Sequence, residues 1–313
     1  MGKEVFVGID VSKDRLDVCV LPDGEKAAFD NSDEGAEALA EELAGRGVTL
    51  VVLEATGGLE RLVVGHLAGK GVAATVANPR RVRQYAQAAG VLAKTDTLDA
   101  QVLARFAADI RPERRPGRSP QEELMRELVA RRSQLMRMRV AEINRQTRMT
   151  DKGIIRDIKS AVKFLDKQIA HVDKRIDDEV NSNPTWKETD ELLQSVPGVG
   201  AKTSRTLMAA LPEIGTLSEK EAASLAGLAP FANESGKMRG KRMISGGRAG
   251  VRNALYMATL VAIVHNEDIR TFYRRLRDAG KSGKVAVTAS MRKLLITLNA
   301  VVARRSKWEP KRA

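Results

Sequence analysis

The stretch VFVGIDVSKDRLDVCVLPDG (residues 5–24) decides the fold of the N-terminal part of the chain. Residues 5–11 form a nearly continuous apolar run that ends in the carboxylate of Asp10. Residues 15–21 then alternate between apolar and polar side chains before a Pro-Asp-Gly turn, which predicts a β-hairpin. A third short strand is expected at residues 27–29.

Beyond these three strands, strand patterns alternate with helical ones. Buried strands are expected at residues 49–53 and 72–77, and helices at residues 36–43 and 59–67. Hairpin strands followed by such an alternation predict an α/β domain in which helices cover the faces of a mixed sheet.

The charge of the chain is divided between its ends. The 313 residues carry a formal net charge of +13, but residues 1–60 hold 5 basic and 14 acidic side chains, and residues 231–313 hold 19 and 5. We therefore expect a cation-binding N-terminal site and a nucleic-acid-binding C-terminal part, with a solubility device as the alternative. Aromatic residues make up 4%, so nucleic-acid contacts should depend on Lys, Arg and backbone amides.

Several classes of protein are excluded at this level. The single cysteine, Cys19, excludes a disulfide framework and a thiolate zinc site. The N-terminus has no signal-peptide pattern, and no apolar stretch approaches the roughly 18 residues of a membrane span. We expect a reducing, cytoplasmic compartment and no membrane partner.

The chain beyond the first domain is predicted to be all-α. Prolines mixed with arginines near residues 111–120 mark a boundary, so we expect a first domain at 1–112, a helical linker and coiled coil at 113–184, and a helical domain with a basic tail at 185–313. The Arg-rich stretch 111–148 suits backbone contacts with nucleic acid.

Apolar residues at spacings of three and four approximate a coiled-coil seam. Its members are Ile154, Ile158, Val162, Leu165, Ile169, Val172, Ile176 and Val180. The favoured interpretation is a helical hairpin used for subunit pairing, and the alternative is packing within one chain.

Four carboxylates have positions that suit a shared site. Asp10 ends the first strand and Glu54 the fourth, while Asp96 and Asp99 lie in KTDTLDAQVLARFA (residues 94–107), where a helix would put both on one face. Oxygen ligands of this kind select Mg²⁺ or Mn²⁺, and a pair of such ions suits phosphoryl transfer. Taken singly, each acid also fits a turn or a helix N-cap. Together, their order resembles the ribonuclease H-like fold of RuvC-type nucleases, whose metal-binding acids occupy those positions.

Two C-terminal segments are suited to DNA. Pro197-Gly198-Val199-Gly200, followed by Lys202, resembles a helix-hairpin-helix element that contacts phosphate through backbone amides; a glycine-capped turn is the alternative. The glycine-rich segment at 227–260 carries two serines among six cations that would stabilise charge during attack on phosphate. These residues are Ser235, Ser245, Lys237, Arg239, Lys241, Arg242, Arg248 and Arg252. The residues alone leave open whether Ser235 is a nucleophile or a phosphate anchor.

Seven motifs occur together and in order along the chain. They are GIDVSK (8–13), LEATGG (53–58), NP (78–79), KTDTLDA (94–100), SVPGVGAKTS (195–204), LAGLAP (225–230), and ESG followed by RGKR (234–242). With them the chain is similar, from end to end, to the DEDD insertion-sequence transposases, the bridge-RNA-guided serine recombinases. The resemblance implies a RuvC-like domain, a coiled coil and a transposase domain, with Mg²⁺ on Asp10, Glu54, Asp96 and Asp99 and with Ser235 as nucleophile.

The resemblance also implies a function and partners. The chain would be an RNA-guided recombinase of a bacterial insertion sequence, acting on donor and target double-stranded DNA through a phosphoserine intermediate. A structured guide RNA and a homo-oligomer, a dimer or a tetramer in the synaptic complex, would be its partners, and DNA binding would bring it to the nucleoid. Relatives often have Ser-Lys-x-Gly where this chain has Ser245-Gly246-Gly247-Arg248. Ser245 is therefore kept as a rival nucleophile.

Two other functions remain open. One is a RuvC-type, metal-dependent Holliday-junction nuclease without a serine nucleophile, and the other is a non-enzymatic RNA-binding or DNA-bridging scaffold. Loss of a covalent protein–DNA adduct in Ser235→Ala would separate the recombinase from the nuclease.

Overall fold

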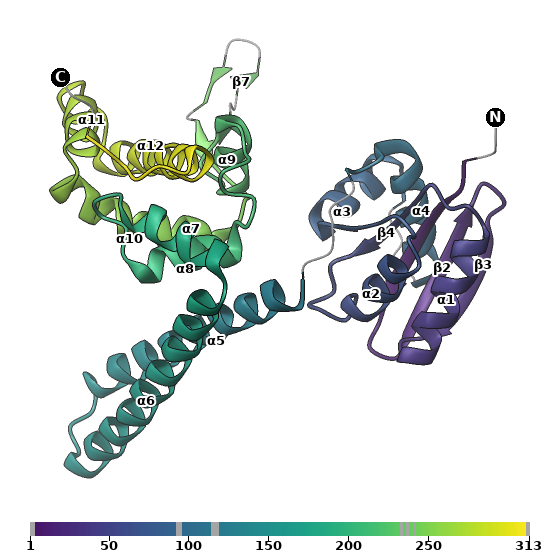
Figure 1. Ribbon diagram of the computed structural model, residues 1–313, viewed down its shortest axis with the longest axis horizontal. Coiled ribbons are helices and arrows are strands. Elements are labelled where there is room, and N and C mark those ends of the chain that lie inside the picture. Colours follow the sequence, from purple (N-terminus) through teal and green to yellow (C-terminus); the bar gives the residue numbers. More distant parts are fainter. Residues whose placement is uncertain are drawn as a thin grey trace. The chain divides into compact units, whose positions relative to one another are not determined.

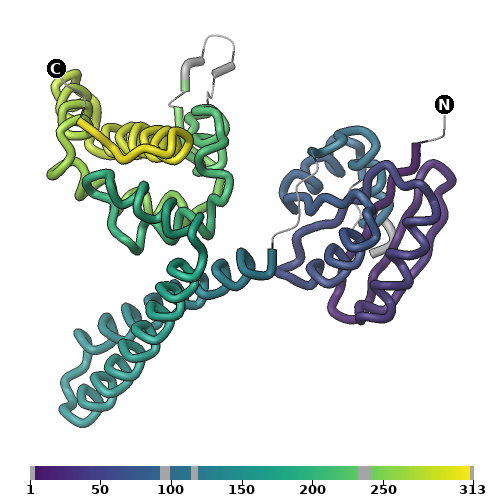
Figure 2. The backbone as a smooth tube through the Cα atoms, in the orientation of Figure 1, coloured from purple at the N-terminus to yellow at the C-terminus, as the bar shows by residue number. Residues whose placement is uncertain are grey.

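The structure, a computed structural model, describes residues 4–91, 96–113, 119–231, 234–235, 238–240 and 242–310 (Figure 2). The side chains of residues 96–98, 234–235 and 238–239 lie outside that description. The chain divides into two compact units, Met1–Arg118 and Ser119–Ala313.

Unit 1 is built on a five-stranded sheet with the strand order β3-β2-β1-β4-β5. β1 (Phe6–Val11), β2 (Arg15–Leu21) and β3 (Glu25–Asp30) pair antiparallel through hairpins, while β4 (Leu50–Glu54) runs parallel to β1 and β5 (Ala74–Ala77) parallel to β4. The predicted mixed sheet is confirmed. The carboxyl ends of β1, β4 and β5 therefore share one edge of the sheet.

Helices cover both faces of this sheet (Figure 1). α1 (Asp33–Gly45) and α2 (Arg61–Gly69) pack on one face, against side chains that include Val7 and Ile9 of β1. α3 (Pro79–Ala88) and α4 (Asp96–Ile110) pack on the other, against Phe6, Leu50 and Val52. Because side chains alternate along a strand, even-numbered residues of β1 and β4 face α4.

Unit 2 begins with a long antiparallel hairpin of α5 (Pro120–Gln146) and α6 (Lys152–Ser182) (Figure 1). Leu165, Ile169 and the three later members of the seam are buried against apolar side chains of α5, including Leu128 and Leu135. The predicted hairpin is confirmed, but over residues 165–180 its seam packs within the chain, which corrects the favoured interpretation that the seam pairs subunits. A heptad-like spacing specifies an apolar stripe and leaves open which helix covers it.

Six further helices form the second core of unit 2. They are α7 (Pro184–Gln194), α8 (Ala201–Ala210), α9 (Glu219–Leu225), α10 (Ala249–His265), α11 (Glu267–Asp278) and α12 (Gly283–Arg304). Among the described helices, α12 is long and apolar enough to cross a membrane by length and composition, contrary to the expectation from sequence. Its Leu294, Leu295 and Leu298 are fully buried in this core, which accounts for their apolar character.

Candidate functional site

The alternation of the sheet places two of the predicted acids on the same face. Asp10 and Glu54 each follow a residue of the register pair Ile9–Leu53, at the carboxyl ends of the neighbouring strands β1 and β4. Both have even numbers in strands whose even-numbered side chains face α4, so both carboxylates are directed to that face. Both residues are partly buried.

α4 brings a third predicted acid to this face. Asp99 immediately precedes Ala100, whose carbonyl oxygen would lie 2.1 Å from a β-carbon on Gly8. Only glycine allows the backbones of β1 and α4 to approach this closely. Gly8 lies two residues before Asp10, so this contact brings the helix that carries Asp99 against the strand that carries Asp10.

Asp96 is the first residue of α4, one helical turn before Asp99, and its side chain lies outside the described residues. The donor set of four carboxylates is oxygen-only and fits a hard cation such as Mg²⁺ or Mn²⁺. Among the described side chains, no group of three or more His, Cys, Asp or Glu residues is close enough to hold a metal ion. A bound cation would therefore need oxygen ligands from Asp96, water or DNA as well.

A fifth carboxylate, which sequence reasoning missed, lies opposite the first. Asp17 of β2 is the register partner of Asp10 and shares its face of the sheet. Arg15 donates to Asp17 Oδ1 through Nε at 3.0 Å and Nη2 at 2.7 Å, which neutralises this carboxylate beside Asp10. The available signal was the hairpin itself, since its turn fixes the register that pairs the two acids.

The loop after Glu54 is held by another carboxylate that sequence reasoning missed. Glu60 Oε2 accepts hydrogen bonds from Thr56 N at 3.1 Å, Thr56 Oγ1 at 3.1 Å and Gly58 N at 2.9 Å. Burial acts to raise the pKa of Glu60, but these backbone and hydroxyl donors outweigh it and hold the pKa below its usual value. Glu60 therefore serves as a structural anchor for the end of β4.

The predicted helix-hairpin-helix turn lies between α7 and α8. Gly198 has φ +103°, and a β-carbon there would lie 2.6 Å from Cβ of Ala262 on α10, so this glycine is required for packing. Gly200 is the N-cap of α8, makes no side-chain capping bond and has open space around its Cα. The following Lys202 is exposed. Gly200 and Lys202 therefore leave the N-terminus of α8 and one cation accessible to phosphate.

The serine segment folds as a paired ribbon, which the sequence did not predict. β6 (Pro230–Phe231) pairs antiparallel with β9 (Met243–Ile244), and β7 (Glu234–Ser235) pairs with β8 (Met238–Arg239). Ser235 is the register partner of Met238. It thus lies on the part of the ribbon farther from its base.

The site residues of this ribbon are described to different extents. The structure describes the backbone of Ser235 and Arg239 but not their side chains. Lys237 and Lys241 lie outside the described residues. Arg242 and Ser245 are exposed.

Two arginines at the base of the ribbon have partners inside unit 2. Arg248 donates through Nη1 and Nη2 to the two carboxylate oxygens of Glu213 at 2.7 and 2.6 Å, and also to the carbonyl of Ala210 at 2.8 Å. Arg252 donates to the carbonyl of Gly246 at 2.7 Å. Both side chains thus stabilise the start of α10, and their predicted phosphate contacts stay a prediction.

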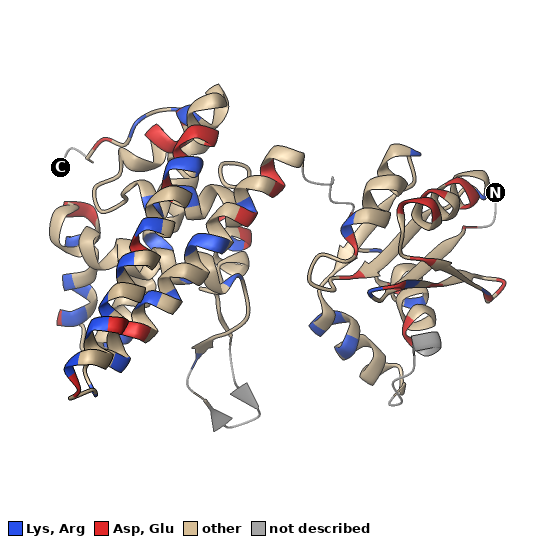
Figure 3. Cartoon of the chain, turned by 90° about the horizontal axis from the view of Figure 1, so that it is seen from below, with Lys and Arg blue, Asp and Glu red and all other residues tan. Residues whose placement is uncertain are grey.

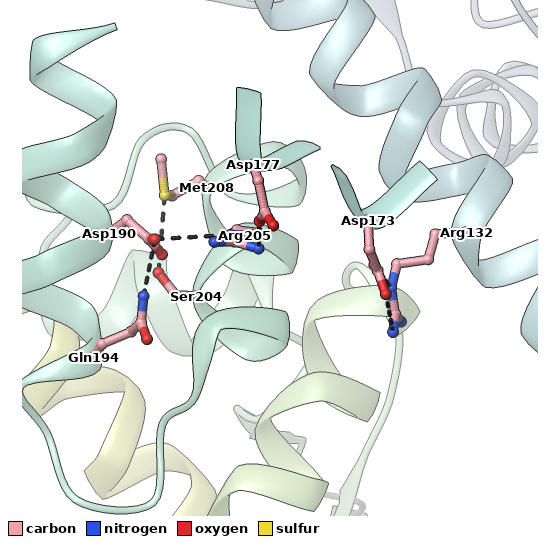
Figure 4. A network of polar contacts seen from close by, with 8 residues as sticks. All are labelled: Arg132, Asp173, Asp177, Asp190, Gln194, Ser204, Arg205 and Met208. Carbon is pink, nitrogen blue, oxygen red and sulfur yellow. Dashed lines mark hydrogen bonds and ion pairs between the residues drawn. The ribbon is translucent and has the colours of Figure 1, made fainter. Parts of the chain in front are cut away.

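A polar network joins the hairpin to the rest of unit 2 (Figure 4). Arg205 of α8 forms ion pairs with Asp177 of α6 and with Asp190 of α7, the second at 3.7 Å. Asp190 is 6% exposed and also accepts a hydrogen bond from Gln194 at 2.8 Å. Its other oxygen, Oδ1, has no hydrogen-bond partner among the described residues, so this carboxylate depends strongly on Arg205.

Two protein families match this chain in comparisons with known proteins. A family described as Transposase, of the DEDD type named for IS110, matches residues 7–152, and a second, Transposase IS116/IS110/IS902 family, matches residues 190–274. The pilin gene-inverting proteins of Moraxella bovis and Moraxella lacunata are each 28% identical over 316 residues, covering 96% of both chains. An uncharacterized 42 kDa protein of insertion element IS900 from Mycobacterium paratuberculosis is 29% identical over 161 residues, 50% of this chain and 39% of that protein.

Among solved structures, T. thermophilus RuvC in complex with a Holliday junction substrate is similar, with 16% identity, a TM-score of 0.28, and coverage of 34% of this chain and 96% of that one. The two family matches together span most of the chain, one on each side of the hairpin helix α6. The chain therefore carries both transposase domains of the IS110 family and is an enzyme of DNA transposition and recombination.

Proposed function

We propose that the chain is an RNA-guided recombinase of an insertion sequence, which cuts and rejoins donor and target DNA through a phosphoserine at Ser235. The observation that carries the proposal is the common direction of Asp10 and Glu54 toward α4, the helix that bears Asp99, in a chain whose second unit has Ser235 in a β-paired segment. Acids and a hydroxyl are the two groups that such chemistry needs.

The serine step conserves the energy of the DNA linkage. Ser235 Oγ attacks phosphorus, so an Oγ–P bond forms and the bond from phosphorus to one sugar oxygen breaks. The serine proton is lost and the freed sugar oxygen gains one, so the step is balanced. A sugar hydroxyl from the other duplex then attacks the phosphoserine and restores the serine, and religation needs no ATP.

The acids would hold the metal. Asp10, Glu54, Asp96 and Asp99 are the residues that would bind Mg²⁺, with Mn²⁺ as a substitute. When bound, Mg²⁺ supplies positive charge against the phosphate oxygens. Glu60 and Gly8 hold the ends of β4 and β1 in place, and Arg15 offsets the additional negative charge of Asp17.

DNA and RNA would contact different groups of the chain. The amides at Gly198 and Gly200 with Lys202, together with the cations from Lys237 to Arg252, would bind DNA backbone without reading its sequence. Target choice would come from base pairing by a structured guide RNA. Sequencing the RNA that copurifies with the protein tests this: a discrete species is expected, and a random mixture would contradict guidance.

A homo-oligomer would complete the site, because Ser235 of one subunit is proposed to join the acids of another. Ile154 and Phe164 of α6 are 48% and 60% exposed and are available to a neighbouring copy. Ile154→Asp with Phe164→Asp should lower the mass of the DNA-bound assembly in light scattering, whereas Lys167→Asp at an exposed polar position should not. A wild-type protein that stays monomeric on DNA would contradict the oligomer.

Two serine variants and one acid variant test the chemistry. Purified protein with its RNA, Mg²⁺ and both DNAs is assayed for strand exchange and for covalent adduct on a denaturing gel. Ser235→Ala should abolish both, the matched control Ser245→Ala should keep both, and Asp10→Asn should lose both.

The remaining outcomes identify the other functions. Cutting that survives Ser235→Ala but not Asp10→Asn would indicate the metal-dependent nuclease. The absence of cutting and exchange by the wild-type protein would indicate the scaffold.

A further inference from the structure

α3 carries a concentration of positive charge in an otherwise acidic unit. Arg80, Arg81 and Arg83 lie within the first five residues of this helix and are all exposed. None of the three has an ion pair or a side-chain hydrogen bond in the described part of the chain. Residues 61–95 hold six basic and no acidic residues, and Figure 3 shows the contrast between basic α3 and acidic α1.

The register of the sheet places the start of α3 beside the acids. Ala77, the last residue of β5, is the register partner of Glu54, and the amide of Ala55 donates to the carbonyl of Ala77 at 3.2 Å. Neighbouring strands lie about 4.8 Å apart. α3 begins two residues after Ala77, with Asn78 capping the amide of Arg80 at 2.9 Å.

The helix that carries the arginines is fixed to the helix that carries Asp99. Val82 is 5% exposed, and the ring of Tyr85 meets that of Phe106 on α4 edge-to-face at 5.5 Å. The Tyr85 hydroxyl donates to Asp109 of α4, and burial with this hydrogen bond raises the pKa of Tyr85 to about 12. The ring contact and this hydrogen bond hold α3 on α4.

We propose that Arg80, Arg81 and Arg83 form a phosphate-binding face that holds the DNA strand at the carboxylate edge of unit 1. Their guanidinium groups can each bind two phosphate oxygens, and no carboxylate among the described residues competes for them. The edge needs such a face, because the acids directed there repel DNA by themselves. The proposal rests on the proposed function in one respect, that DNA is processed at this edge.

The ligand is assigned as DNA because α3 starts two residues after Ala77, the register partner of Glu54, where the proposed reaction handles a DNA phosphodiester. The test measures binding of the full-length protein, stripped of nucleic acid at high salt, to a DNA duplex of mixed sequence and to an RNA duplex of the same sequence. Replacing all three arginines by alanine should weaken DNA binding at least tenfold. It should also reduce the salt dependence of DNA binding, measured as the slope of the logarithm of the binding constant against the logarithm of the salt concentration. We expect this slope, called the DNA slope, to fall by about 0.9 for each phosphate that is no longer neutralised.

A charge-matched control removes three cations elsewhere in unit 1. The control residues are Lys26 on β3, Arg46 at the end of α1 and Lys70 at the end of α2. Their joint replacement by alanine should leave the DNA slope unchanged. Replacing the three α3 arginines by lysine should keep most of the slope, because the charges remain. Thermal unfolding checks that each variant is folded.

Two results would overturn the proposal. One is an unchanged DNA slope in the folded alanine variant, and the other is a loss confined to the RNA duplex, which would assign the face to RNA. Because binding is measured without any cutting, a failure of the Ser235 mechanism would leave these slopes unaffected, so the two failures are distinguishable.

Discussion

A β-carbon on Gly8 would lie 2.1 Å from the carbonyl oxygen of Ala100, so β1 and α4 touch backbone to backbone at this point. Asp10 lies two residues after Gly8, and Asp99 lies one residue before Ala100. Because Gly8 has no side chain, β1 and α4 can approach closely, and this approach determines how far apart Asp10 and Asp99 lie.

Gly8→Ala should separate α4 from β1. The new methyl group would also meet Ala104 N at 2.3 Å, and backbone atoms cannot yield as the end of a side chain can. We expect the free energy of unfolding to fall by about 1–3 kcal/mol. We also expect the rate of DNA cutting to fall by more than this loss of stability explains, because the two acids move apart. Gly65→Ala is the control: nothing lies within 4 Å of its β-carbon, and a gain of about 0.5–1 kcal/mol is expected for this helical site. Wild-type cutting by Gly8→Ala would contradict the role of this contact.

Gly198→Ala should destabilise unit 2. A left-handed φ and a contact of 2.6 Å with Ala262 both oppose a side chain there, and we expect a loss of about 2 kcal/mol or more in urea unfolding. Gly200→Ala, two residues later in open space, should change stability by less than about 1 kcal/mol. Equal effects of the two variants would show that the turn does not depend on packing against α10.

Glu60→Gln should change how stability depends on pH. The pKa of Glu60 is lowered in the folded protein, so its contribution is fully present above its ordinary value of 4.5 and is lost as pH falls through the lowered pKa. The variant should be less stable than wild type at pH 7, and the difference should shrink as the solution is acidified below that value. Urea unfolding at pH 3–7 measures this; a difference that is constant with pH would exclude the charge of Glu60 as the cause.

Arg205→Met should be among the most destabilising single changes in unit 2. It leaves Asp190 buried without its cation, which typically costs about 3–5 kcal/mol. Adding Asp190→Asn should recover part of the loss, because the uncompensated charge is removed. Arg139→Met breaks a more exposed pair with Asp166 and should cost about 1 kcal/mol or less. Additivity of the Arg205 and Asp190 changes in thermal unfolding would argue against the network.

The sheet of unit 1 could be predicted because successive side chains of a strand point to opposite faces, so apolar residues recur at every second position of the sequence. The same period directs Asp10 and Glu54 to one face of the sheet, so their shared direction could be predicted from the pattern alone. Asp17 did not, because a single charged residue in an alternating strand is typical of a solvent-facing position. Glu60 was also missed, since its role depends on a loop conformation that no period encodes.

The fold of unit 2 was harder to predict from the sequence for two physical reasons. A stripe such as that from Leu165 to Val180 identifies a helix face, but its covering helix is set by tertiary packing. The ribbon around Ser235 consists of pairs of two-residue strands in a glycine-rich segment, too short for any alternation to emerge. The exposed arginines of α3 were overlooked because their importance depends on the register of β5 with β4.

The two ends of the ribbon meet backbone to backbone where it joins the helical core. A β-carbon on Gly247 would lie 2.1 Å from the amide nitrogen of Gly227, and Arg248 is clamped to Glu213 immediately afterwards. Segments whose two ends meet in this way can be lengthened or exchanged at low entropic cost. Extra residues between these two ends would therefore cost little entropy on folding and would leave the supporting helices in their arrangement.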